Sequence, residues 1–424
     1  MSKGDEQRRS LDQDRYLTYI QLDGVTDGFI SRYKTGISHH RQEEKRLRIR
    51  KAGDGRHDVQ GFTVDSRGGF TEFESETTLG KLTYGASYYL DQVDSFRNNV
   101  APNGSLSSRS IQGPVADDSD YHLAGAFIQN HTAITDRLDT WIGGRFTYAE
   151  AAIGRSEDPV TGAETSFGDD WTNFVGSGRF TYDVTTDGSL GLFGGVSQGF
   201  RAPNLSDLSR LDSARSDEIE TPSPGLDPEK YLSYEIGIRA QSDRARAALG
   251  YYCTDIDDYI LGVRTGRIID GDFEVTKINA GTGFVQGIEL ETSYDLTDSL
   301  SLFGWASWQD GELENEPISR MMPFSAQAGI RYQFPNETAW LEWLAIGATE
   351  QDELSSRDQR DTQRIPLGGT PGYVIGMIRG GWEITPGVTL TCAIENLTAE
   401  AYRVHGSGIN APGRNFIFGA EVKS

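Results

Sequence analysis

The sequence predicts an all-β fold, a large transmembrane antiparallel up-and-down β-barrel. Segments of roughly 10 to 13 residues alternate apolar and polar side chains with a period of two, about twice the length of an ordinary soluble strand and enough to cross a bilayer at a tilt. The polar phase carries glycine, arginine and glutamate, as a wet or plugged lumen requires. Long polar stretches also alternate with short turns, a pattern typical of extracellular loops and periplasmic turns.

The composition is compatible with this class. The 424 residues include 40 Lys+Arg and 63 Asp+Glu, so the formal net charge is −23. This balance predicts no nucleic-acid partner, because phosphate backbones are bound by net basic surfaces. Only 36% of the residues are hydrophobic, which suffices when one residue in two along each strand faces lipid. The first ten residues, MSKGDEQRRS, lack the apolar segment of a secretory signal.

The strand pattern can be followed in chain order. In residues 81–90 one phase reads Leu, Tyr, Ala, Tyr, Leu and the other is mostly polar. Residues 232–240 and 245–253 repeat the alternation on either side of the short turn Ser242-Asp243, which predicts an antiparallel hairpin. Residues 325–334 and 388–395 show the same split. We count roughly 18 candidate strands in all.

One segment does not alternate cleanly. Residues 340–346 are apolar in both phases except at Glu342. A charge on the lipid face costs about 2 to 4 kcal/mol in the worst cases, so we expect Glu342 to face the lumen. That orientation also turns Trp340, Leu344 and Ile346 inward, where they would pack against loops or a plug.

The long polar stretches are expected to be extracellular loops and to carry any ligand affinity, since loops on a rigid scaffold commonly do. These stretches are residues 95–120, 154–170, 206–228 and 351–371. Short turns are expected at Ser242-Asp243, residues 295–298 and Pro386-Gly387.

Three stretches carry more specific motifs. The first reads GFRAPNLSDL at residues 199–208 and continues as PGLDPEKY at 224–231; the second reads RMMPF at 320–324; the third reads ENLTAEAYR at 395–403 and HGSGINAPGRNF at 405–416. Together they resemble TonB-dependent outer-membrane receptors. The residues that carry the signature are Phe200, Arg201, Ala202, Pro203, Asn396, Leu397, Tyr402, His405, Gly406, Ser407, Gly408, Pro412, Gly413, Arg414, Asn415 and Phe416. The tetrapeptide at 200–203 is expected to be structural, at the point where a strand meets an extracellular loop.

The resemblance implies a receptor for energised uptake in the outer membrane of Gram-negative bacteria. Such a receptor is a barrel of about 22 strands with a plugged lumen. Its partners would be outer-membrane lipid, the TonB energy-transducing complex and a scarce small ligand, most often a ferric siderophore or another iron complex, and we expect a monomer. The resemblance covers the C-terminal barrel, so residues 1–424 are expected to form an N-terminally truncated barrel domain without a plug domain. Neither a cofactor nor a resident metal is implied, and no ligand-binding residue is assigned.

Other functions remain open at this stage. A plugless passive porin or a non-functional truncated barrel fragment would show the same alternation. Residues 195–199, GVSQG, match the nucleophile-elbow pattern, but that chemistry needs a following helix with a later acid and histidine, so no enzyme is predicted. Receptors that take up haem typically carry a histidine between the two boxes of the first motif, and residues 203–224 contain none.

Overall fold

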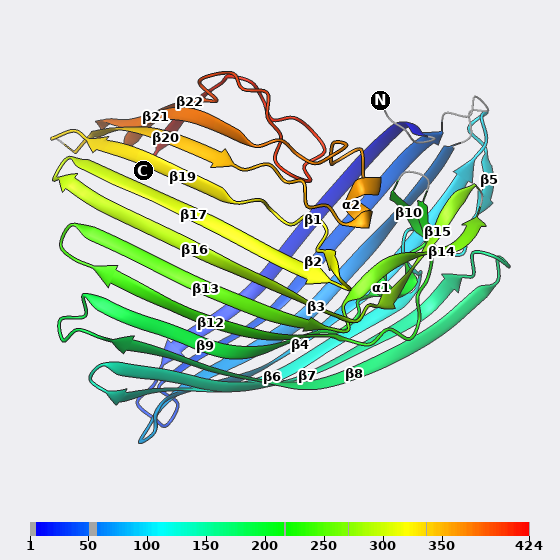
Figure 1. The fold of residues 1–424 in the computed structure, drawn as a ribbon. Coiled ribbons are helices and arrows are strands. Elements are labelled where there is room, and N and C mark those ends of the chain that lie inside the picture. The colour runs from blue at the N-terminus through cyan, green and yellow to red at the C-terminus, as the bar shows by residue number, and fades with distance from the viewer. Residues whose placement is uncertain (1–5, 51–56, 216–217, 270, 336, 424) are drawn as a thin grey trace.

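The strands form one continuous curved wall (Figure 1). The computed structural model describes residues 6–50, 57–215, 218–269, 271–335 and 337–423. Within these ranges a 19-stranded antiparallel sheet makes the wall, and a separate 4-stranded sheet lies at one end of it. The predicted all-β, antiparallel barrel architecture is therefore confirmed.

Long strands follow one another around the wall in chain order, each antiparallel to the next. Their bounds are β1 (Glu6–Val25), β2 (Arg32–Arg50), β3 (His57–Thr77), β4 (Gly80–Val100), β6 (Ser119–Thr135), β7 (Leu138–Glu157), β8 (Glu164–Asp183), β9 (Leu190–Arg201), β12 (Glu229–Gln241), β13 (Ala245–Asp257), β16 (Thr282–Thr297), β17 (Leu300–Leu313), β19 (Ser325–Gln333), β20 (Ala339–Ala348), β21 (Tyr373–Thr385), β22 (Val388–Glu395) and β23 (Asn415–Val422). Short additions to the same sheet are β5 (Leu106–Arg109) and β18 (Glu316–Pro317).

The two ends of the wall differ. Short turns gather at one end, hereafter the turn end, at residues 242–244, 298–299 and 386–387. Two of them contain the predicted turns Ser242-Asp243 and Pro386-Gly387, whereas the turn predicted at residues 295–298 starts later because β16 continues to Thr297. Longer connections gather at the other, the loop end (Figure 1). They hold the 4-stranded sheet and two short helices: β10 (Asp212–Arg215), β11 (Glu218–Glu220), β14 (Ile260–Ile269), β15 (Asp272–Asn279), α1 (Leu205–Ser209) and α2 (Ser356–Arg360).

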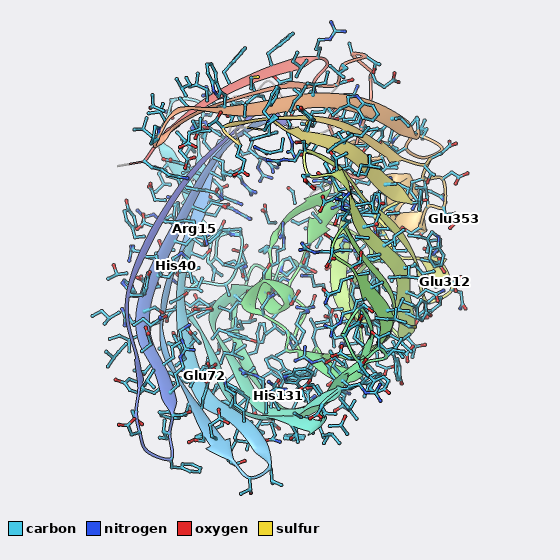
Figure 2. The ribbon with its side chains drawn as sticks, turned by 90° about the vertical axis from the view of Figure 1, so that its left-hand side faces the viewer. Arg15, His40, Glu72, His131, Glu312 and Glu353 are labelled. Atoms are coloured by element: carbon cyan, nitrogen blue, oxygen red, sulfur yellow. The ribbon has the colours of Figure 1, made fainter. Side chains whose placement is uncertain are left out.

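The first and last strands form the two edges of the described wall. β1 pairs with β2, and β23 pairs with β22. No pairing joins β1 to β23 among the residues that the structure describes. Side chains on both edge strands are strongly exposed, for example Leu17 at 63% and Phe418 at 82%. Seen from the turn end, the strands enclose an interior in which a short helix from the green part of the chain lies (Figure 2).

The outer face of the wall is apolar. Ile128, Ile142, Phe174 and Ile236 all lie on it and are more than half exposed. Their neighbours in sequence point to the lumen, because successive side chains of a strand alternate between its faces. The period-two pattern thus assigned the outer face correctly, and no helix in the described ranges is long and apolar enough to cross a membrane.

Two of the predicted loops are wrong in extent. Residues 154–170 were expected to be a loop, but β7 continues to Glu157 and β8 begins at Glu164. Residues 95–120 lose their first part to β4, which runs to Val100. Near the loop end the outward-facing side chains of these strands are mostly polar, so the period-two signal disappears, while the backbone hydrogen bonds, which do not depend on side-chain polarity, continue. Residues 206–228 and 351–371 connect wall strands as expected.

Glu342 faces the lumen, as predicted. It is 2% exposed and lies between two arginines: Arg379 donates Nε to its Oε1, and Arg331 lies 3.6 Å from its Oε2. The guanidinium of Arg331 also stacks over the ring of Trp340 at 4.3 Å. This stacking supplies the inward-facing Trp340 with a partner that the sequence pattern alone did not reveal.

Candidate functional site

The connection between β9 and β12 folds into the lumen at the loop end. Its α1 packs on the inner face of β7 and β8 in an apolar cluster that includes Leu205, Leu208, Leu226, Ala149 and Trp171, all at most 9% exposed. The indole Nε1 of Trp171 donates to the backbone oxygen of Leu226 at 3.2 Å. Burial of apolar side chains is the main driving force for packing. The shared apolar cluster therefore holds this loop against the inner face of the wall.

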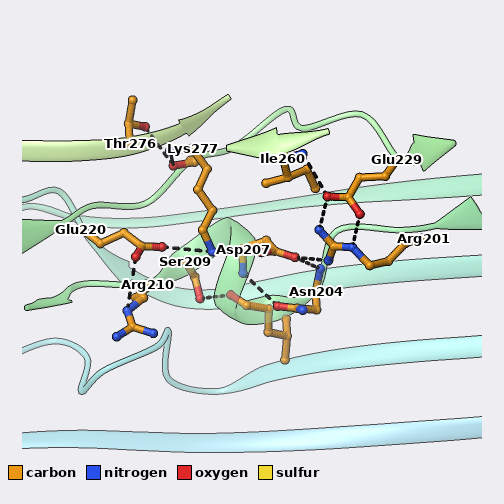
Figure 3. Close-up of polar contacts among 12 residues, drawn as sticks. Arg201, Asn204, Asp207, Ser209, Arg210, Glu220, Glu229, Ile260, Thr276 and Lys277 are labelled. Atoms are coloured by element: carbon orange, nitrogen blue, oxygen red, sulfur yellow. Dashed lines mark hydrogen bonds and ion pairs between the residues drawn. The ribbon is translucent and has the colours of Figure 1, made fainter. Parts of the chain in front are cut away.

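Arg201, the last residue of β9, is the centre of a polar network (Figure 3). It donates Nε and Nη2 to the two carboxylate oxygens of Glu229 at 2.5 and 2.7 Å, and Nη1 to Asp207 at 2.7 Å. Glu229 also accepts the backbone N–H of Ile260 at 2.9 Å and the hydroxyl of Tyr231. One guanidinium therefore joins β9, α1 and β12, and Glu229 extends the connection to β14.

Asp207 has a second role in the helix that it occupies. Asn204 caps α1 by accepting the backbone N–H of Asp207 at 2.9 Å, and Asp207 accepts the backbone N–H of Asn204 at 3.1 Å, a reciprocal capping box. Lys277 of β15 adds an ion pair at 2.9 Å. Burial raises the pKa of Asp207, but the hydrogen bonds from Lys277 and Arg201 outweigh it and leave that pKa below its usual range.

The network continues into the 4-stranded sheet. Lys277 lies 3.0 Å from Glu220, which also faces Arg210 at 3.5 Å (Figure 3). In the same sheet Glu274, 1% exposed, accepts both Arg267 and Thr265. Burial opposes its ionisation, yet these donors hold the pKa of Glu274 below its usual range. The sheet at the loop end is thus cross-linked by ionised pairs.

A second polar group ties this loop to the opposite wall. Arg46 of β2 donates to Asp212 at 2.6 Å, and Arg97 of β4 donates to the backbone oxygen of Leu211 at 2.5 Å. Arg48 pairs with Asp58 at 2.9 Å and also donates to Ser213 of β10 at 2.8 Å. The loop therefore spans from β9 and β12 across to β2, β3 and β4.

The C-terminal signature forms a separate structure between β22 and β23. Asn396, with a φ of 49° and 2% exposure, donates to the backbone oxygens of Glu400 and Pro412 and accepts the N–H of Glu400. Arg414 donates to the backbone oxygen of Leu397. Gly406 and Gly408 adopt φ of 75° and 78°, a region that favours glycine. These residues shape their own loop.

His405 connects this loop to its neighbours. Its Nδ1 lies 2.9 Å from the hydroxyl of Thr370, and it is 7% exposed. Nearby, Arg320 of the second motif pairs with Asp361 and donates its backbone N–H to Asp358. Burial lowers the pKa of His405, so the ring is held neutral as a hydrogen-bonding group.

The structure therefore separates the signature residues into two places. Residues 200–203 lie around the Arg201 network, at the point where β9 meets the loop, while residues 396–414 form the loop after β22 and Asn415 and Phe416 begin β23. Sequence reasoning missed the partners of Arg201. The signal in the sequence was that the first motif itself contains the acidic residues Asp207 and Glu229.

Two other sequence candidates do not form chemical sites. Residues 195–199 lie wholly within β9, and Ser197 is paired in the sheet with Ser177 and Ser233, so the strand-turn-helix that a nucleophile elbow requires does not occur there. Among the described residues no group of three or more His, Cys, Asp or Glu side chains is arranged to hold a metal ion.

Comparison with known proteins identifies the architecture. The sequence matches the family described as TonB dependent receptor-like, beta-barrel, over residues 3–397. A search among curated proteins found no match. The fold is similar to that of the copper transporter OprC, with a TM-score of 0.83 and 16% identity over 97% of this chain and 66% of that one.

Two further solved structures show the same likeness. A double mutant of the Serratia marcescens hemophore receptor HasR, in complex with its hemophore HasA and heme, gives a TM-score of 0.75 at 14% identity over 98% of this chain and 66% of that one. The FrpB iron transporter from Neisseria meningitidis gives 0.71 at 16% identity over 96% and 63%. The chain spans just under two thirds of the length of these proteins. At such identities the likeness establishes the fold, and the family match covers nearly the whole chain, so this chain belongs to the TonB-dependent receptor β-barrel family.

Proposed function

We propose that this chain is the barrel portion of an outer-membrane receptor that takes up a scarce substrate, most often an iron complex such as a ferric siderophore, with energy supplied through the TonB complex. Family membership supports a receptor or transporter. The similar folds belong to proteins described as copper, hemophore and iron transporters or receptors. The domain limits 1–424, the monomeric state and the outer-membrane location are part of this proposal.

The inward-folded loop after β9 is the observation that carries the proposal. The Arg201 network and the Arg46 group anchor this loop on both sides of the lumen. Side chains held in place at the mouth of a barrel suit a receptor, because a preorganised site loses less entropy when it binds a ligand. The anchored loop therefore supports the receptor interpretation, and the conductance measurement below tests the porin alternative.

The test is uptake of radiolabelled ferric siderophores by iron-starved cells that express the complete reading frame containing this chain. We expect accumulation that stops when the TonB complex is deleted or the proton gradient is collapsed. The Arg201→Met variant should lose most uptake, and Arg239→Met, which removes an exposed pair with Asp183, should retain it. Large open-channel conductance in planar bilayers, independent of TonB, would support the porin alternative instead.

A further inference from the structure

The inward-folded loop crosses the lumen and is held by two different kinds of contact. On one side α1 packs against β7 and β8 in an apolar cluster, and Asp207 of α1 pairs with Arg201 of β9. We call this side the base. On the other side β10, an edge strand of the 4-stranded sheet, meets the inner face of β2 and β4. We call this contact the latch; it joins Leu211, Asp212 and Ser213 to Arg46, Arg48 and Arg97.

Polar contacts dominate the latch. Each of its three arginines donates a hydrogen bond to an oxygen of the loop. Leu211 adds a buried apolar side chain, 4% exposed, but it does not belong to the apolar cluster that includes Leu205, Leu208 and Leu226 at the base. Burial of apolar area is the main force that holds packed elements together. The base is therefore held more strongly than the latch.

Arg97 is the poorly paired member of the latch. Its side chain, 15% exposed, donates to two neutral oxygens, that of Gln60 at 2.7 Å and the backbone oxygen of Leu211. Asp212 lies 4.0 Å from its Nη2 and is engaged by Arg46. Neutral acceptors replace only part of the hydration that a cation loses on burial. The closed latch is therefore destabilised at Arg97, and opening returns this side chain to water.

Three more polar atoms on the wall are poorly satisfied while the latch is closed. Arg46 Nε, Asp58 Oδ1 and Gln60 Nε2 are buried and have no hydrogen-bond partner among the described residues. Asp58 and Gln60 contact arginines of the latch, and Arg46 is one of them. The base contains no atom of this kind in the part of the chain that the structure describes. Since an unpaired buried polar atom destabilises the state that buries it, the entry of water favours an open latch.

The side of the 4-stranded sheet that faces the base is better paired. Lys277 of β15 lies 2.9 Å from Asp207 of α1 and 3.0 Å from Glu220 of β11. The backbone N–H of Ile260, at the start of β14, donates to Glu229 at 2.9 Å. These contacts leave a hinge at the base when β10 moves away from the wall.

We propose that the latch opens independently of the base. The 4-stranded sheet swings away from β2 and β4 about the contacts of β14 and β15, and α1 stays docked on β7 and β8. The structure holds the closed arrangement. Gln60 sets the balance, because it places a neutral amide beside Arg97 where a carboxylate would complete an ion pair. Opening clears the lumen next to β2 and β4 without unfolding the loop.

The experiment measures the distance between two spin labels in the purified full-length receptor in detergent by pulsed electron paramagnetic resonance. The labels are attached to Ile37→Cys on the outer face of β2 and Ile268→Cys on β14, positions that are 65% and 64% exposed. Cys253 and Cys392 are replaced by serine so that only these two positions react. Because the sheet moves away from β2, the open latch has the longer distance.

Three substitutions then shift the balance. Asp212→Asn removes the carboxylate that accepts Arg46 and should raise the population of the longer distance about tenfold. Adding Gln60→Glu gives Arg97 an acidic partner and should lower that population again about fivefold. Asp258→Asn is the matched control, because it removes an exposed pair with Lys230 at the same end of the wall. Its distances should equal those of the unmodified protein.

Hydrogen exchange separates opening of the latch from release of the whole loop. In Asp212→Asn the amides of Asp207 and Leu208, both bonded to Asn204, should keep their protection. The amide of Leu211, which donates to the backbone oxygen of Pro114 at 3.2 Å, should exchange about tenfold faster. Equal loss of protection in α1 would show that the loop moves as one unit and would overturn the inference.

Two results of the distance measurement would also overturn it. One is the same distance distribution in Asp212→Asn and Asp258→Asn, and the other is no return of the shorter distance on adding Gln60→Glu. If Asp212→Asn fails to fold, as judged by heat-modifiable gel migration, Ser213→Ala takes its place; it removes the oxygen that accepts Arg48 and should raise the open population about threefold. The measurement uses neither ligand nor the TonB complex, so its failure leaves the proposed function standing.

Discussion

Replacement of Arg201 by methionine should release the inward-folded loop. The change removes three charge-assisted hydrogen bonds, two to Glu229 and one to Asp207. Such bonds contribute about 1.5 to 3 kcal/mol each. The sum must be discounted, because the Arg201 side chain is 39% exposed and both carboxylates keep other donors. We expect the local free energy of opening to fall by about 2 to 4 kcal/mol.

Hydrogen exchange measures this opening directly. Backbone amides of residues 203–212 and 258–262 should exchange about 30 to 1,000 times faster in the variant, since about 1.4 kcal/mol corresponds to a tenfold change. Arg239→Met is the control: its pair with Asp183 is exposed at 51% and 34%, and exposed pairs contribute at most about 1 kcal/mol.

If Arg201→Met and Arg239→Met change exchange equally in residues 203–212, the network does not hold the loop. A double-mutant cycle of Arg201→Met with Glu229→Gln should also give a coupling energy of about 1 to 3 kcal/mol, and additive effects would contradict the pairing seen in the structure.

Three further changes test the wall and the C-terminal loop. Glu342→Gln should lower the free energy of unfolding in urea by about 1 to 3 kcal/mol, because it leaves two lumen arginines without their shared carboxylate; an unchanged midpoint would contradict the ion pairs. Ile128→Arg, on the outer face near the middle of β6, should make the free energy of folding into lipid vesicles less favourable by about 2 to 4 kcal/mol. Gln129→Arg, which changes the neighbouring lumen-facing residue, should have a much smaller effect. Equal losses in the two variants would contradict the assignment of faces. The pKa of His405 is lower in the folded state than its ordinary value of about 6.5, so the unfolded loop binds the proton more readily. Protection of residues 396–414 from hydrogen exchange should therefore fall as the pH drops below about 6.5. Greater protection in acid, or the same loss of protection in His405→Gln, would contradict this.

The sequence predicted the wall well because strand alternation is a local property. The outer face of each strand is apolar because it faces lipid, whatever the other strands do. Strands that follow one another in the chain are also neighbours in the sheet. For Glu342, the cost of placing a charge in lipid was enough to predict that its side chain faces the lumen. The alternation did not reveal that β7 extends to Glu157 and that β8 begins at Glu164. Where strands extend beyond the lipid, their outward side chains need not be apolar, although their backbone hydrogen bonds continue.

By itself, then, the sequence determined the all-β class, the faces of the strands and the positions of the signature motifs. The tertiary structure decided which charged groups meet. Arg201 and Glu229 are 28 positions apart, Asp207 and Lys277 are 70 apart, and Arg46 and Asp212 are 166 apart. No periodicity relates such positions. They come together only because the curved wall brings β2 opposite the loop after β9, and the lumen that results removes these side chains from water, so that each buried charge requires a partner.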